Sequence, residues 1–109
     1  PTQVMHQFQG AFVAEKHFCV TDEDVLNAIR FHTSARPNMS ELEKLVFLAD
    51  MVEEERRYEG VERIRELFWK GDNLDECLAL ALKETLLFLE KKGGEVYPLT
   101  RLAYEYYKK

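Results

Sequence analysis

Apolar residues recur along most of this chain at the three- and four-residue spacings of an amphipathic helix, and no segment alternates with the period of a strand. Short polar stretches that carry glycine, proline or helix-capping residues separate these segments. The pattern therefore predicts an all-α fold of about six helices. The expected helices are residues 4–18, Thr21–Thr33, a segment that begins at Ser40 and ends in the charged run 53–57, Val61–Lys70, Leu74–Lys92 and Leu99–Lys109.

Capping residues stand at several of the expected helix ends. Thr21 precedes three acidic residues, which is typical of a hydroxyl N-cap followed by acids that complement the helix dipole. Ser40 and Glu43 have the spacing of a capping box. Gly71 and Gly93 follow lysines at the ends of apolar patterns, as expected of C-terminal caps. These residues predict helix boundaries and carry no chemistry of their own.

A histidine and an aspartate stand on helix faces that the pattern predicts to be buried. His32 shares one face with Ala28 and Ile29, and Asp50 lies inside an apolar run on the same side as Val46 and neighbouring apolar residues. A buried carboxylate without a partner costs several kcal/mol, so Asp50 needs a cation, hydrogen-bond donors or a metal. Two interpretations remain open. Both residues are metal ligands, or His32 is a hydrogen-bonded core residue and Asp50 is salt-bridged.

Composition narrows the possible classes of protein. With 109 residues, of which 46% are hydrophobic and 32% charged, the chain is expected to be one soluble globular domain. Its net charge of −5 and scattered basic residues argue against a nucleic-acid-binding surface. No apolar run approaches the length of a membrane span. Cys19 and Cys77 are isolated, which favours reduced thiols and a cytoplasmic location.

Several motifs resemble the C-terminal half of the HD-domain phosphohydrolases of the YqeK type, and the resemblance extends weakly over nearly the whole chain. It implies an HD-domain-like helical bundle of which residues 1–109 form the C-terminal portion. The matching stretches are Ala28-Ile29-Arg30-Phe31-His32-Thr33, Arg36-Pro37-Asn38-Met39, Leu42-Glu43-Lys44 and Leu48-Ala49-Asp50.

The same resemblance implies a set of metal ligands. His6, which is followed by Gly10-Ala11, matches a ligand of the family, and so do His32 and Asp50. The metal implied is divalent, with iron expected and two ions in a complete domain. The family takes its name from a His-Asp doublet, and this sequence contains no such pair. We therefore expect a partial domain in which the first helices, with the doublet, are absent.

The resemblance also implies contacts with a nucleotide. Arg56 matches an arginine that contacts phosphate, although Glu54 replaces the usual proline and Arg57 is a rival. From the pattern alone, this run is a solvated helix end and the glycines at 93 and 94 are a plain helix stop. The residues to which the resemblance gives a nucleotide-binding role are Thr33, Arg56, Gly94, Glu95, Val96, Tyr97 and Pro98.

The function implied is metal-dependent hydrolysis of dinucleoside polyphosphates, with diadenosine tetraphosphate giving ADP. A metal-bound water would be the nucleophile, and no protein nucleophile is required. Because the doublet is missing, this chain alone is expected to be inactive. It would need a separate N-terminal half, or it would associate with itself through exposed apolar stripes. The alternative is a non-catalytic nucleotide-binding or protein-interaction domain that retains the HD half-fold.

Overall fold

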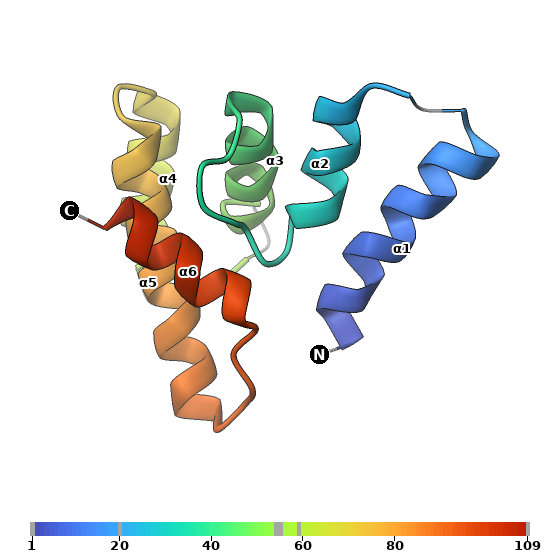
Figure 1. Ribbon diagram of the computed structural model, residues 1–109. Helices are drawn as coiled ribbons and strands as arrows, with labels where there is room; N and C mark the ends of the chain where they lie inside the picture. Colours follow the sequence, from blue (N-terminus) through green and yellow to red (C-terminus); the bar gives the residue numbers. More distant parts are fainter. Residues whose placement is uncertain (1, 20, 54–55, 59, 109) are drawn as a thin grey trace.

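The structure is a computed structural model that describes residues 2–19, 21–53, 56–58 and 60–108, with only the backbone of residues 2–6. Its described residues form helices and no strand, as predicted (Figure 1). None of these helices is both long enough and apolar enough to cross a lipid bilayer. The helices are α1 (Thr2–His17), α2 (Glu23–Phe31), α3 (Glu41–Met51), α4 (Val61–Lys70), α5 (Leu74–Lys92) and α6 (Pro98–Tyr107).

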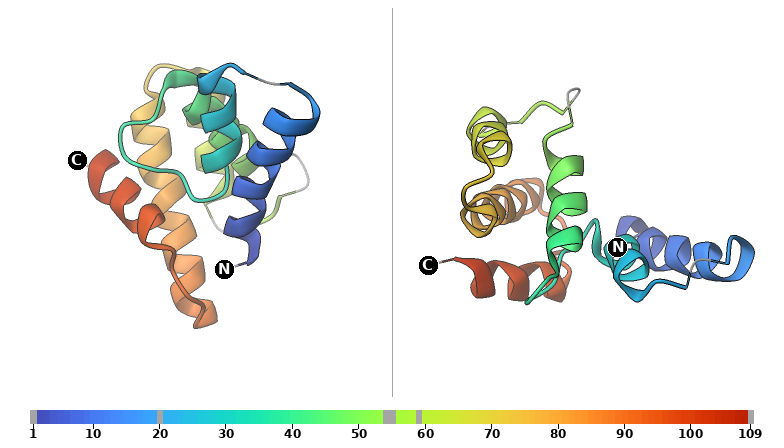
Figure 2. Two further views of the ribbon diagram at one scale, coloured as in Figure 1. Left: turned by 45° about the vertical axis from the view of Figure 1, so that its right-hand side comes forward. Right: turned by 90° about the horizontal axis from the view of Figure 1, so that it is seen from above.

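Helix α3 stands in the middle of the molecule. It packs against α2 on one side and α5 on the other, while α1 packs on α2, and both α4 and α6 pack on α5. Seen from above, α1 and α2 extend to one side of α3 and the three C-terminal helices to the other (Figure 2). The fold therefore consists of an N-terminal group, α1 and α2, and a C-terminal group, α4, α5 and α6, which α3 joins.

The main core lies in the C-terminal group. Phe47 and Leu48 of α3 meet Leu78 and Leu82 of α5 and Ile64 of α4, and all five side chains are at most 2% exposed. Burying a side chain of this size stabilises a fold by about 1.5–3 kcal/mol. This cluster therefore fixes which side of α3 faces inward.

The predicted caps are present, with one correction. Ser40 and Glu43 form the capping box at the start of α3, and Gly71 and Gly93 end α4 and α5 with a φ of 71°. At α2, however, the cap is Asp22 rather than Thr21, because the Asp22 carboxylate accepts hydrogen bonds from the backbone amides of the first turn. The expected N-cap of α2 was therefore one residue too early in the sequence.

The two cysteines are free thiols, as expected. Cys19 is exposed, whereas Cys77 is fully buried in the core. Burial raises the pKa of the Cys77 thiol to about 11, so this side chain is protonated at neutral pH and acts as a small apolar residue.

Candidate functional site

His32 caps the C-terminal end of α2 and is half-buried. Its Nδ1 lies 2.6 Å from the carbonyl oxygen of Ile29. A carbonyl can only accept a hydrogen bond, so Nδ1 is the donor here and Nε2 is the nitrogen that remains for other contacts. This is the arrangement that orients a histidine for metal binding through Nε2. The hydrogen bond is also what a histidine with a purely structural role would make, so it fits both interpretations of the sequence.

The loop after His32 is anchored by a buried side chain from α1. Gln7 is fully buried, and its Oε1 accepts hydrogen bonds from the backbone amides of Thr33 (2.8 Å) and Ser34 (3.1 Å). Its Nε2 donates to Ser34 Oγ over 2.8 Å. The backbone amide of Thr33 therefore binds Gln7. The neighbour of Gln7, His6, has a side chain outside the described part of the structure, so its predicted ligand role is untested.

Asp50 is not buried, contrary to the prediction from the apolar run around it. Its side chain is 49% exposed, and Oδ2 accepts a hydrogen bond from Arg56 Nη2 over 2.9 Å. The prediction failed because α3 packs onto α5 through Phe47 and Leu48, whereas Val46, one turn before Asp50, remains exposed. A salt bridge of Asp50, which was one of the two interpretations of the sequence, is therefore present. The Asp50 carboxylate remains accessible to solvent.

The structure does bring together Asp50 and Arg56, two of the residues singled out from the sequence. Both side chains are close to half exposed, and such ion pairs contribute only about 0–1 kcal/mol. An incoming cation or anion can therefore separate the two side chains at little cost. The rival arginine, Arg57, donates to the Arg56 carbonyl over 3.1 Å.

The predicted nucleotide loop follows α5. Gly93 has a φ of 71°, and the amide of Gly94 donates to the Leu89 carbonyl over 3.0 Å, which closes the helix. Gly94 and Glu95 are exposed, Val96 and Tyr97 are half-buried, and Pro98 is the first residue of α6. The two glycines thus serve to end α5. Contact of this loop with a nucleotide stays a prediction.

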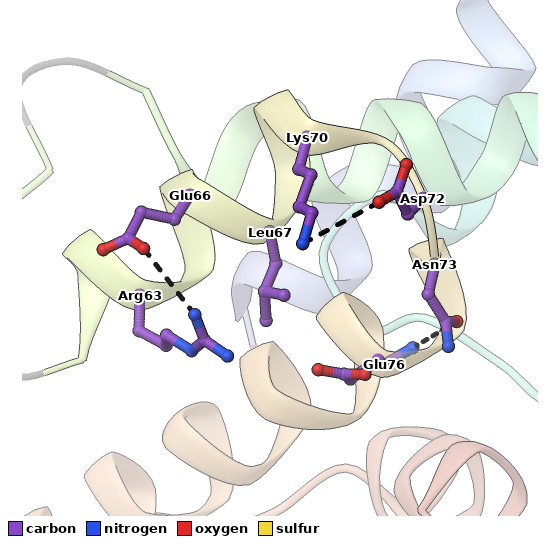
Figure 3. A pocket seen from close by; sticks show the side chains of 7 residues that line it. All are labelled: Arg63, Glu66, Leu67, Lys70, Asp72, Asn73 and Glu76. Atoms are coloured by element: carbon purple, nitrogen blue, oxygen red, sulfur yellow. Dashed lines mark hydrogen bonds and ion pairs between the residues drawn. The ribbon is translucent and has the colours of Figure 1, made fainter.

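A pocket of about 380 Å³ lies elsewhere, between α4 and the start of α5 (Figure 3). Its cations are paired with carboxylates: Arg63 with Glu66, and Lys70 with Asp72. Asn73 caps α5 from within it. None of the predicted site residues lines this pocket, and its paired charges make it a poor site for a phosphate.

Within the described residues, no three His, Cys, Asp or Glu side chains come together as a metal cluster. The geometry thus supplies an accessible carboxylate beside an arginine, and a histidine oriented by a backbone carbonyl. Imidazole and carboxylate groups are each ligand types that divalent metals accept, but these two side chains are not part of any metal cluster among the described residues. Two residues with contacts near this site were not predicted from the sequence: Gln7, which binds the loop after His32, and Arg65, which donates hydrogen bonds to the carbonyls of Val52 and Glu53 after α3. For Arg65 there was a signal, because it is a cation on the apolar stripe of residues 61–70.

No family model matches this chain. It is similar to the symmetrical bis(5'-nucleosyl)-tetraphosphatase of Bacillus subtilis, with 39% identity over 95% of the chain and 55% of that protein. The protein of the same name from Halalkalibacterium halodurans is 42% identical over 94% of the chain and 54% of that protein. A solved structure of a predicted HD superfamily hydrolase involved in NAD metabolism, from Clostridium acetobutylicum, matches with a TM-score of 0.86 and 39% identity over 94% of the chain and 53% of the other. The chain spans about half the length of the curated relatives it matches.

Proposed function

Because this chain is homologous to about half of the symmetrical bis(5'-nucleosyl)-tetraphosphatases, we propose that it is part of a hydrolase that cleaves dinucleoside polyphosphates to nucleoside diphosphates. The observation that carries the proposal is the similarity itself, which covers 94–95% of the chain at 39–42% identity. The fold, shared with an HD superfamily hydrolase, supports it. Diadenosine tetraphosphate is the substrate proposed, with ADP as the product.

The proposed metal ligands are His6, His32 and Asp50. His32 would bind through Nε2, which the hydrogen bond at Nδ1 leaves free, and Asp50 would bind through its accessible carboxylate. Iron is the ion proposed, with two ions in a complete domain. When bound, such ions activate water and neutralise charge on phosphate. No Ser, Cys or carboxylate nucleophile is required of this chain.

The proposed nucleotide contacts are Arg56, Thr33 and the loop Gly94–Pro98. Arg56 pairs with Asp50, so its guanidinium lies next to a side chain that would hold the metal. A guanidinium suits this role because it stays charged and donates two parallel hydrogen bonds to a phosphate. In this arrangement Arg56 binds and orients the phosphate and stabilises negative charge that develops on it.

The 109 residues are proposed to turn over little substrate by themselves, because the sequence has no His-Asp doublet to complete a two-metal site. A cytoplasmic location is proposed as well. The second candidate function is a nucleotide-binding or interaction module without catalysis. The weak, exposed pair of Asp50 and Arg56 is compatible with it, since an arginine that is easily released can bind phosphate without any metal.

The proposed partner is the half of the domain that the relatives have and this chain does not match. Large apolar side chains of the N-terminal helices are exposed and would be covered by such a partner, or by a second copy of the chain. Those with the largest exposure in this region are Phe12 (59%), Val13 (42%) and Phe18 (74%).

Metal content and ADP release test the proposal. The purified chain is incubated with iron or manganese, alone and with the other half of a relative, and both quantities are measured. His32→Ala and Asp50→Asn should each lower metal affinity by more than the roughly 10–100-fold that loss of a supporting residue costs. His17→Ala, a histidine exposed on α1, is the matched control and should have no effect.

The outcomes separate the two functions. Stoichiometric metal together with ADP release in the presence of the second half supports the hydrolase. ADP binding without any metal uptake or phosphate chemistry supports the binding module instead. Equal metal affinity of the wild type and both variants would refute the proposed ligands.

A further inference from the structure

Arg65 is an arginine of α4 whose side chain is only 16% exposed, and it contacts the backbone that follows α3. Its Nε donates to the carbonyl of Val52 over 3.1 Å. Its Nη2 donates to the carbonyls of Glu53 and Arg56, each over 2.8 Å. A single guanidinium thus binds three carbonyl groups from the end of a helix and the residues beyond it.

Of these carbonyls, that of Val52 lies at the C-cap of α3, whereas those of Glu53 and Arg56 also accept from the Arg56 amide and the Arg57 guanidinium. The last carbonyls of a helix have no partner inside the helix, and α3 has no basic residue in its last turn. Arg65 supplies a donor to the Val52 carbonyl from a neighbouring helix, and it also forms an ion pair with Glu62 at 3.3 Å on the side of Nη1. The guanidinium reaches these three acceptors from two separate nitrogens of a rigid planar fork, whereas the three N–H groups of a lysine all leave from one atom, so lysine is not an equivalent replacement.

We propose that Arg65 is a positioning residue, which fixes the backbone at Val52, Glu53 and Arg56 and thereby sets the Arg56 guanidinium against Asp50. The chain of contacts is continuous, from Arg65 to the Arg56 carbonyl and from Arg56 Nη2 to Asp50 Oδ2. The functional consequence rests on the proposed function, in which Arg56 binds phosphate. Arg65 itself touches neither phosphate nor metal in this scheme.

The test compares Arg65→Lys with Arg63→Lys. Arg63 lies on the same helix, is 60% exposed and pairs with Glu66 rather than with the loop, so it is a matched control. The first measurement needs no nucleotide: amide hydrogen exchange at Arg56, whose N–H donates to the Glu53 carbonyl over 2.9 Å. Arg65→Lys should speed this exchange about tenfold or more while core amides of α5 keep their protection. Unchanged exchange at Arg56 would overturn the proposal.

The second measurement is the affinity for ADP in a double-mutant cycle. Arg56→Ala and Arg65→Lys should each weaken binding about tenfold, and the double variant should be no weaker than Arg56→Ala alone. Additive losses would mean that Arg65 does not act through Arg56, which refutes the inference. If exchange at Arg56 changes as expected but Arg56→Ala leaves ADP binding intact, the positioning role stands and the proposed phosphate contact fails.

Discussion

At the scale of single residues, a buried glutamine joins the first helix to the loop that follows His32. Gln7 makes three hydrogen bonds in a place that water does not reach, and two of them satisfy backbone amides of the loop. An apolar side chain of the same length would leave those amides without partners. Each unsatisfied buried group costs about 1–3 kcal/mol.

We therefore expect Gln7→Leu to lower the free energy of unfolding by about 2–4 kcal/mol. Gln9→Leu is the control, because Gln9 is exposed on the same helix, and its effect should stay within about 0.5 kcal/mol. Urea denaturation of the two variants measures the difference. Similar losses in both would show that the hydrogen bonds of Gln7 contribute nothing specific.

A second residue-scale feature is the pairing of Glu43 with Arg36. The Glu43 side chain is almost completely buried, and its two oxygens accept from Arg36 Nε (2.7 Å) and Nη2 (2.8 Å). Burial by itself raises the pKa of Glu43, but the hydrogen bonds from Arg36 and Ser40 outweigh it, so the pKa lies below its usual value. The ionised form of Glu43 is therefore favoured over its protonated form more strongly in the folded chain than in the unfolded chain.

The sign of the pH dependence follows from this lowered pKa. The stabilisation is present above the unfolded-state pKa of about 4.3 and is lost as the pH falls below it, towards the pKa of the folded state. Glu43→Gln should be less stable than the wild type at pH 6 by about 2 kcal/mol, and the gap should narrow by pH 3. Thermal unfolding from pH 6 to 3 measures it, and a constant gap would contradict the assignment.

At the scale of elements, α6 is held to the loop before α3 by its last residue. The Tyr107 hydroxyl accepts a hydrogen bond from the buried backbone amide of Met39 over 2.7 Å, across 68 residues of sequence. Thr100, near the start of α6, donates to the carbonyl of Ser34 over 2.9 Å. Both ends of α6 thus contact the loop between α2 and α3.

Tyr107→Phe should cost about 1–3 kcal/mol, because it leaves the buried amide of Met39 without an acceptor. Tyr106→Phe is a close control, since the Tyr106 hydroxyl lies 3.3 Å from Asn38 Oδ1 at the surface. Its effect should be within about 0.5 kcal/mol. Chemical denaturation distinguishes the two, and equal effects would show that the hydroxyl of Tyr107 is not needed for docking α6.

At the scale of the whole molecule, both groups of helices leave large apolar side chains exposed. The largest core cluster includes residues of α3–α6, whereas α1 leaves Phe8, Phe12 and Val13 exposed to between 36% and 59%. Exposed apolar side chains of this size on neighbouring turns mark a surface that associates. The row on α1 is therefore one candidate surface for association, and Leu87 and Phe88, exposed on α5, are another.

We expect Phe12→Glu to reduce self-association of the isolated chain at high micromolar concentration, measured by sedimentation. Phe88→Glu is the control, because Phe88 is of the same type and is 56% exposed on α5 in the other group of helices. Its sedimentation should match that of the wild type. A larger effect of Phe88→Glu would place the associating surface on the C-terminal helices.

The sequence by itself determined the helices and most of their ends. Helix periodicity and caps are local properties, so Ser40 with Glu43, Gly71 and Gly93 could be read from a few neighbouring residues. The relatives of the chain could also be predicted, because the motifs around His32 and Asp50 are short and specific. Similarity to the tetraphosphatases over nearly the whole chain confirmed that resemblance.

The tertiary structure alone decided which faces are buried and which side chains meet. Residues 45–49 of α3 are all apolar, so periodicity could not choose between its sides, and only packing against α5 turned Asp50 outward. Contacts such as Gln7 with Thr33 and Arg65 with Val52 join residues far apart in sequence. They depend on how the helices pack, since a hydrogen bond between distant residues forms only where the fold has already brought the donor and acceptor within about 3 Å.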